Sequence, residues 1–131
     1  MVPEVPMIQS FRDLTVWHKA VDLAEHVYSA SDKFPKSEAF GLTSQMRRAA
    51  VSIPLNIAEG ASSSSNAEFG RFLSYSYRSL KETITALELC QRLYSSLRPP
   101  TTLIDEANQI SRMTYNLIHK VSPDIGLRWE S

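Results

Sequence analysis

Several kinds of residue are scarce in this sequence, and each shortage excludes a class of protein. The 131-residue chain has one cysteine, Cys90, so it cannot form an internal disulfide, and it offers no cysteine–histidine cluster for structural zinc. Its 14 basic and 14 acidic side chains cancel. This balance excludes a nucleic-acid binder that works by bulk positive charge, but it allows one that works by a local basic patch.

Long apolar runs are also missing. No stretch approaches the roughly 18 uninterrupted apolar residues that a membrane span requires. The first residues, MVPEVPMIQS, have neither the charged start nor the apolar core of a secretory signal. We therefore expect a cytoplasmic protein that has no membrane partner.

The sequence contains no common catalytic or cofactor-binding motif. It has no GxGxxG, GxxxxGK[ST] or GxSxG, and no Glu-x-x-His pair of the di-iron bundle type. His18, Asp22 and His26 have the i, i+4 spacing of metal ligands on one helix face, but no second helix offers an obvious donor. We favour a solvated polar face there, and we read Ser62–Ser65 as a polar spacer rather than a nucleophile. The sequence therefore predicts no enzymatic activity, no metal and no cofactor.

The first apolar pattern predicts a helix that is capped by Asp13 and ends near Ser31. Two apolar stripes run along it and make a wider apolar face than an isolated surface helix needs. This width favours two neighbouring helices or a partner subunit. The stripes consist of Leu14, Trp17, Val21, Ala24 and Tyr28, and of Val16, Ala20, Leu23, Val27 and Ala30.

The second pattern predicts a helix that begins after Gly41 and ends near Gly60. Pro54 lies inside it and removes one backbone hydrogen bond, at a cost of roughly 3 kcal/mol. We expect one helix that is kinked around Val51–Pro54, with two shorter helices as the alternative.

Capping-box patterns mark the starts of the last two helices. Ser65 and Glu68 open a helix over residues 66–96, and Thr102 with Asp105 opens the last one. No segment alternates with period two over a useful length, so we expect no strands. The predicted fold is all-α: an up-down-up-down four-helix bundle over residues 13–122, between a flexible segment at 1–12 and a loosely held tail at 123–131.

A polar stripe follows the second predicted helix, opposite its apolar face. Its members advance by three or four residues, and most are Gln, Ser and Asn rather than the Lys and Glu of a typical solvated face. We interpret it as a shared hydrogen-bonding face, with a plain surface face as the alternative. The stripe consists of Gln45, Arg48, Ser52, Asn56 and Glu59.

Basic residues are concentrated in the middle of the chain. Residues 42–98 hold seven basic and four acidic side chains. Arg71, Tyr75 and Arg78 share one face of the third predicted helix, with Lys81 beside them. Guanidinium groups there can contact phosphates while the ring offers a stacking surface. The alternative is an exposed face on which Glu82 pairs with Arg78.

Three segments carry a resemblance to a known family: FRDLTVWHKAVDLA, FPKSEAFGLTSQMRRAAVSIPLNIAEG and EFGRFLSYSYRSLKE. In this order they resemble the four-helix-bundle family that includes proteins encoded in intervening sequences of bacterial 23S ribosomal RNA. The resemblance covers about residues 10–121. It implies a bundle that assembles as a ring-like pentamer, with no known enzymatic activity. More distantly, the chain is similar to the accessory variability protein of diversity-generating retroelements, a pentameric partner of a reverse transcriptase that binds nucleic acid.

The resemblance also marks a set of recurrent polar positions, which implies a shared site or interface without naming its ligand. The chain departs from the family in its Ser-rich linker and at Tyr77 and Arg78. The matching positions are Gln45, Arg47, Arg48, Ser52, Asn56, Glu59, Gly60 and Glu82.

Together these patterns favour a non-enzymatic homo-oligomer, a pentamer by the resemblance, that binds RNA or a nucleic-acid-processing partner. The alternative is a purely structural scaffold with a protein partner, in which the polar stripe seals the interface between subunits. A metal-dependent bundle enzyme is a third hypothesis, and it rests on His18, Asp22 and His26 alone.

Overall fold

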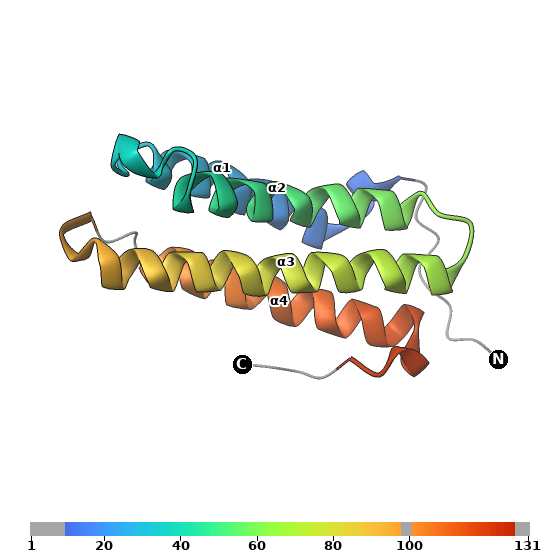
Figure 1. The fold of residues 1–131 in the computed structure, drawn as a ribbon. Coiled ribbons are helices and arrows are strands. Elements are labelled where there is room, and N and C mark those ends of the chain that lie inside the picture. Colours follow the sequence, from blue (N-terminus) through green and yellow to red (C-terminus); the bar gives the residue numbers. More distant parts are fainter. Residues whose placement is uncertain (1–9, 98–100, 128–131) are drawn as a thin grey trace.

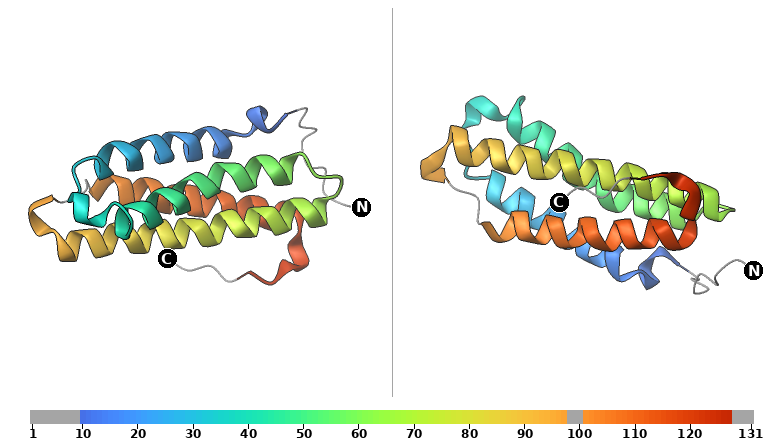
Figure 2. Two further views of the ribbon diagram at one scale, coloured as in Figure 1. Left: turned by 45° about the horizontal axis from the view of Figure 1, so that its top comes forward. Right: turned by 90° about the horizontal axis from the view of Figure 1, so that it is seen from below.

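The computed structural model describes residues 10–97 and 101–127. Four long helices account for most of them: α1 (Thr15–Ser31), α2 (Leu42–Ala61), α3 (Asn66–Leu93) and α4 (Thr101–Val121). Within the described residues there is no strand, and the predicted all-α class is confirmed. Figure 1 shows α1 and α2 lying together above α3 and α4, and Figure 2 gives two further views of this arrangement.

The core lies between the four helices and is made of fully buried apolar side chains. Of the two stripes on α1, the one with Val16, Ala20, Leu23 and Val27 faces this core. The other stripe is half-buried along most of its length and ends at the exposed ring of Tyr28. The largest fully buried apolar side chains are Leu23, Met46, Ile53, Ile57, Leu73, Leu80, Leu87, Ile110 and Ile118.

The start of α1 differs from the prediction. Asp13 is not its N-cap but belongs to a preceding 3-10 turn, Phe11–Asp13. There the Asp13 carboxylate accepts a hydrogen bond from the Ser10 backbone N–H at 3.2 Å, and the Ser10 hydroxyl accepts one from the Arg12 N–H at 3.1 Å. This reciprocal bonding uses the Asp13 side chain, and α1 starts after Leu14 without a side-chain cap.

The start of α3 agrees with the prediction in part. The Ser65 hydroxyl caps the helix by accepting from the Glu68 N–H at 3.1 Å. The Glu68 carboxylate does not complete the capping box, because it bonds the Arg71 guanidinium at 2.7 Å instead.

Two other predicted helix boundaries are wrong by a few residues. We expected α3 to reach Ser96, but it ends at Leu93, where Tyr94 leaves the helix and donates its hydroxyl proton to the Glu38 carboxylate. Thr102 does not cap α4, because it lies within that helix.

α2 is one helix from Leu42 to Ala61 in spite of Pro54, as predicted. The proline cannot donate a backbone hydrogen bond within the helix. A bond from the neighbouring helix reaches the same turn, where the Ser76 hydroxyl of α3 donates to the Ile53 carbonyl at 2.8 Å. The kink at this turn stays a prediction.

The first residues of the expected C-terminal tail pack against α3. They form a 3-10 turn, Pro123–Ile125, shown in red at the end of α4 in Figure 1. Gly70 makes room for this segment, because a Cβ atom there would lie 2.5 Å from the Cβ of Ser122. Ile125 and Leu127 are half-buried against the core.

None of the helices in residues 10–97 and 101–127 combines the length and apolar character that a membrane span needs.

α2 and α3 lie close together at Gly60, which is buried. A Cβ atom at this glycine would lie 2.9 Å from the Cβ of Phe72 and 3.2 Å from the Phe69 carbonyl oxygen. Neither atom is the free end of a flexible side chain. The glycine therefore fixes how near the two helices can lie.

We predict that Gly60→Ala lowers the free energy of unfolding by about 1–3 kcal/mol, the usual cost of an overpacked core. Helix propensity alone predicts the opposite sign, a gain of about 0.5–1 kcal/mol. Urea unfolding of the two proteins decides between them. A variant as stable as the parent, or more stable, would show that the helices separate at little cost.

Candidate nucleic-acid interface

The predicted polar stripe occupies the edge of α2 beside α3. Gln45, Arg48 and Glu59 are exposed, whereas Ser52 and Asn56 are half-buried. The side chains therefore divide into an inner pair near α3 and three outer members that reach solvent.

Hydrogen bonds tie the inner pair to both helices. The Ser52 hydroxyl donates to the Ala49 carbonyl at 2.9 Å and shares a hydrogen bond with the Ser79 hydroxyl of α3. The Asn56 amide donates to the Ser52 carbonyl at 2.8 Å. The stripe is thus joined to α3 at Ser52, and its outer members share one surface with the exposed edge of that helix.

That edge of α3 carries the predicted basic patch. The guanidinium carbons of Arg71 and Arg78 each lie 5.9 Å from the centre of the Tyr75 ring. Arg71 also pairs with Glu68, and this hydrogen bond raises the pKa of its guanidinium. Among the described residues, Arg78 forms no ion pair with Glu82, the contact that the alternative interpretation of this face required.

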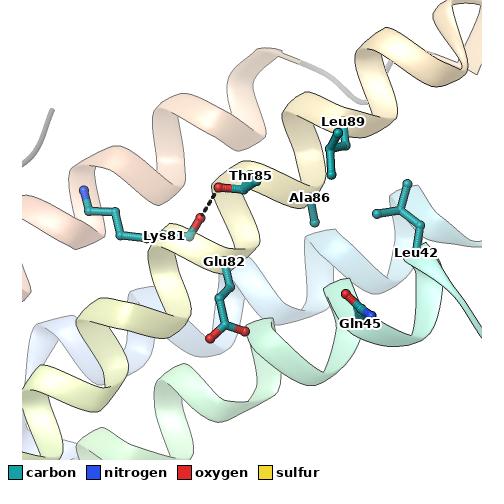
Figure 3. A pocket seen from close by; sticks show the side chains of 7 residues that line it. All are labelled: Leu42, Gln45, Lys81, Glu82, Thr85, Ala86 and Leu89. Carbon is teal, nitrogen blue, oxygen red and sulfur yellow. Dashed lines mark hydrogen bonds between the residues drawn. The ribbon is translucent and has the colours of Figure 1, made fainter.

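Lys81 lies apart from this group. Its ammonium nitrogen is 4.8 Å from the centre of the Tyr77 ring. Figure 3 shows its side chain pointing away from Glu82 and toward α4. The structure therefore does not bring Lys81 together with Arg71 and Arg78.

Arg47, although next to Arg48 in sequence, faces α1. Its guanidinium donates to the Ser31 hydroxyl at 2.7 Å, to the Asp32 carboxylate at 2.8 Å and to the Tyr28 carbonyl at 3.3 Å. It also lies 4.5 Å from the centre of the Tyr28 ring. These contacts join α2 to the last turn of α1, where the carbonyl ends of the helix favour a cation.

A groove opens where the stripe meets the far end of the α3 edge. It has a volume of about 330 Å³ and is lined by residues of both helices. Figure 3 shows Leu42, Ala86 and Leu89 gathered at one end, with Gln45 and Glu82 farther along the groove. Sequence reasoning placed Gln45 and Glu82 in one set but missed the groove, because the apolar residues that form it look like ordinary core positions.

The histidines of α1 bind neighbouring groups of the protein. His18 Nε2 lies 2.7 Å from the Arg12 carbonyl oxygen, and His26 Nδ1 lies 2.9 and 3.0 Å from the carboxylate oxygens of Glu106 on α4. Nowhere in the described part of the chain do three His, Cys, Asp or Glu side chains converge as metal ligands. The hydrogen bond that His26 makes to the Glu106 carboxylate is the largest cause that raises the pKa of His26 above its ordinary value of 6.5.

Comparison with known proteins identifies the family of this chain. The sequence profile described as "23S rRNA-intervening sequence protein" matches residues 12–116. The chain belongs to this family. The match spans all of α1, α2 and α3 and most of α4, so it includes every residue of the polar stripe, the basic patch and the groove between α2 and α3. No curated protein matches the chain.

The contrast between two adjacent arginines is testable. We predict that Arg47→Ala lowers the free energy of unfolding by about 1–3 kcal/mol, because it removes hydrogen bonds made by a charged group. Arg48→Ala is the matched control and should change stability by less than about 0.5 kcal/mol, as exposed substitutions usually do. Urea unfolding measures both, and equal effects would contradict the assigned role of Arg47.

The His26–Glu106 pair predicts a pH dependence of stability. Its contribution is complete below the unfolded-state pKa of histidine and disappears as pH rises through the raised pKa of the folded state. His26→Gln should therefore lower the melting temperature near about pH 5.5 and have no such effect above about pH 8. The side chain of His26 is 57% exposed, so the effect stays below about 1 kcal/mol. A difference that grows with pH would contradict this pairing.

Proposed function

We propose that this chain is a non-enzymatic RNA-binding protein that acts in the cytoplasm as a homo-oligomer. The observation that carries the proposal is the arrangement of Arg71 and Arg78 around Tyr75 on the exposed edge of α3. The family description, which names ribosomal RNA, supports the choice of ligand.

The chemistry of this surface suits a single strand of RNA. Guanidinium groups bind phosphate oxygens, and an aromatic face stacks on an unpaired base. Arg48 and Arg78 take part in no ion pair within the part of the chain that the structure describes, so both charges are available. The exposed amide of Gln45 adds a group that both donates and accepts hydrogen bonds.

Assembly rests on a different face. A groove of about 500 Å³ between α1 and α2 is lined by Val21, Ala24 and Tyr28 from the half-buried stripe of α1, by Glu25 and Ser29 beside them, and by Val51 and Pro54 of α2. Leu55 lies next to it in sequence and is 63% exposed. A second copy that covers this face would bury the apolar surface. In this proposal the up-down-up-down bundle closes into a ring-like pentamer, and repetition of the RNA site around the ring increases avidity.

The second candidate function is a scaffold that assembles in the same way and binds a protein partner instead of RNA. The apolar α1–α2 groove supports it, because the groove accounts for assembly without any RNA.

Binding measured over a range of salt concentrations separates the two functions. We predict that Arg71→Ala combined with Arg78→Ala weakens binding to single-stranded RNA and reduces the slope of log affinity against log salt. The reduction should be about 1.4 for each bound copy, because two phosphate contacts are lost. The double variant Lys33→Ala with Lys36→Ala removes the same charge from exposed positions elsewhere and should leave the slope unchanged.

Light scattering completes the experiment. The parent protein and both double variants should have the mass of about five chains, and RNA should increase this mass for the parent at low salt. An oligomer whose mass does not change when RNA is added, at any salt concentration, would support the scaffold function and contradict RNA binding. A monomer would contradict the assembly.

A further inference from the structure

The groove between α2 and α3 has two chemically different ends. Leu42, Leu89 and the neighbouring Ala86 form an apolar slot at one end, and Gln45 and Glu82 lie at the other end (Figure 3). A slot between two aliphatic side chains accepts a flat ring. The polar end can then bond the edge of that ring.

The Glu82 carboxylate restricts which hydrogen-bonding groups the edge of the bound ring can carry. The carboxylate is exposed and takes part in no ion pair within residues 10–97 and 101–127. An ionised carboxylate only accepts hydrogen bonds, and it repels phosphate. On a surface that binds RNA, it fits a base that presents N–H donors.

Two exposed guanidinium groups lie on the same two helices as the groove and can bind the phosphates of a strand that reaches it. Arg48 follows Gln45 by three residues on α2, and Arg78 precedes Glu82 by four residues on α3, so each lies one helical turn from a polar residue of the groove. Both side chains are exposed. A strand whose phosphates contact these arginines presents its base to the groove.

We propose that this groove binds an unpaired guanine base. The proposal rests on the RNA-binding function above and names the part of the ligand that the groove recognises. The Watson–Crick edge of guanine carries two adjacent donors, N1–H and the N2 amino group, which match the two oxygens of Glu82. The neighbouring O6 accepts from the Gln45 amide. Adenine, cytosine and uracil each place an acceptor beside their donor, and that acceptor faces the second carboxylate oxygen.

The test uses short single-stranded oligouridylates whose central residue is guanosine, inosine or adenosine. The guanosine oligonucleotide should bind at least about fivefold more tightly than the adenosine one, the lower range for a bidentate base contact. Inosine, which lacks the N2 amino group, should fall between them. Glu82→Gln should abolish these differences.

Glu88→Gln is the matched control, because it removes the same charge from an exposed position on α3 that does not line the groove. It should keep the guanosine preference. Leu89→Ala, which removes one wall without changing charge, should weaken binding of the guanosine oligonucleotide more than that of the adenosine one. Melting curves of each variant verify that it is folded.

The outcomes separate this inference from the function on which it rests. If all three oligonucleotides bind equally and binding falls with salt, the guanine site is wrong and RNA binding stands. If none binds, both are wrong. If Glu88→Gln also loses the guanosine preference, the preference comes from the overall charge of the protein, and the guanine site in the groove is wrong.

Discussion

The close approach of α2 and α3 is the constraint on which the rest of the molecule depends. Gly60 has no side chain to hold the helices apart, and about two helical turns earlier along α2 the hydroxyls of Ser52 and Ser79 share a hydrogen bond between the same two helices. Small residues at this seam bring the exposed edges of the two helices together. The amide of Gln45 and the carboxylate of Glu82, which lie far apart in the sequence, consequently line one groove.

The helices themselves could be predicted from the sequence, because the period of the apolar residues records which face of each helix is buried. Several of their ends could be predicted too, among them the end of α1 at Ser31, the start of α2 after Gly41 and the Ser65 cap of α3. The starts of α1 and α4 and the end of α3 could not, because the apolar period does not record which partner a polar side chain bonds. Asp13 looked like a cap but bonds backward to Ser10, and α3 stops where the Tyr94 hydroxyl meets Glu38 on a distant turn.

The candidate site divides in the same way. Spacing within one helix fixes a shared face, so the arrangement of Arg71, Tyr75 and Arg78 followed from the sequence and is found in the structure. Spacing does not say which neighbour a side chain meets. Arg47 donates a hydrogen bond to Ser31 of α1, and the Lys81 ammonium lies over the Tyr77 ring on the side of α4. Arg47 belongs to the packing of α2 against α1, whereas Lys81 lines the α2–α3 groove beside Glu82 and carries its ammonium group toward Tyr77.

The exposed edge of α3 runs from Arg71 to Leu89 on one unbroken helix. At 1.5 Å per residue this edge is about 27 Å long. Stacked nucleotides advance by about 3.4 Å each, so the edge matches the length of roughly eight of them. In the proposed function, the length of α3 therefore sets how many stacked nucleotides of RNA one chain can contact.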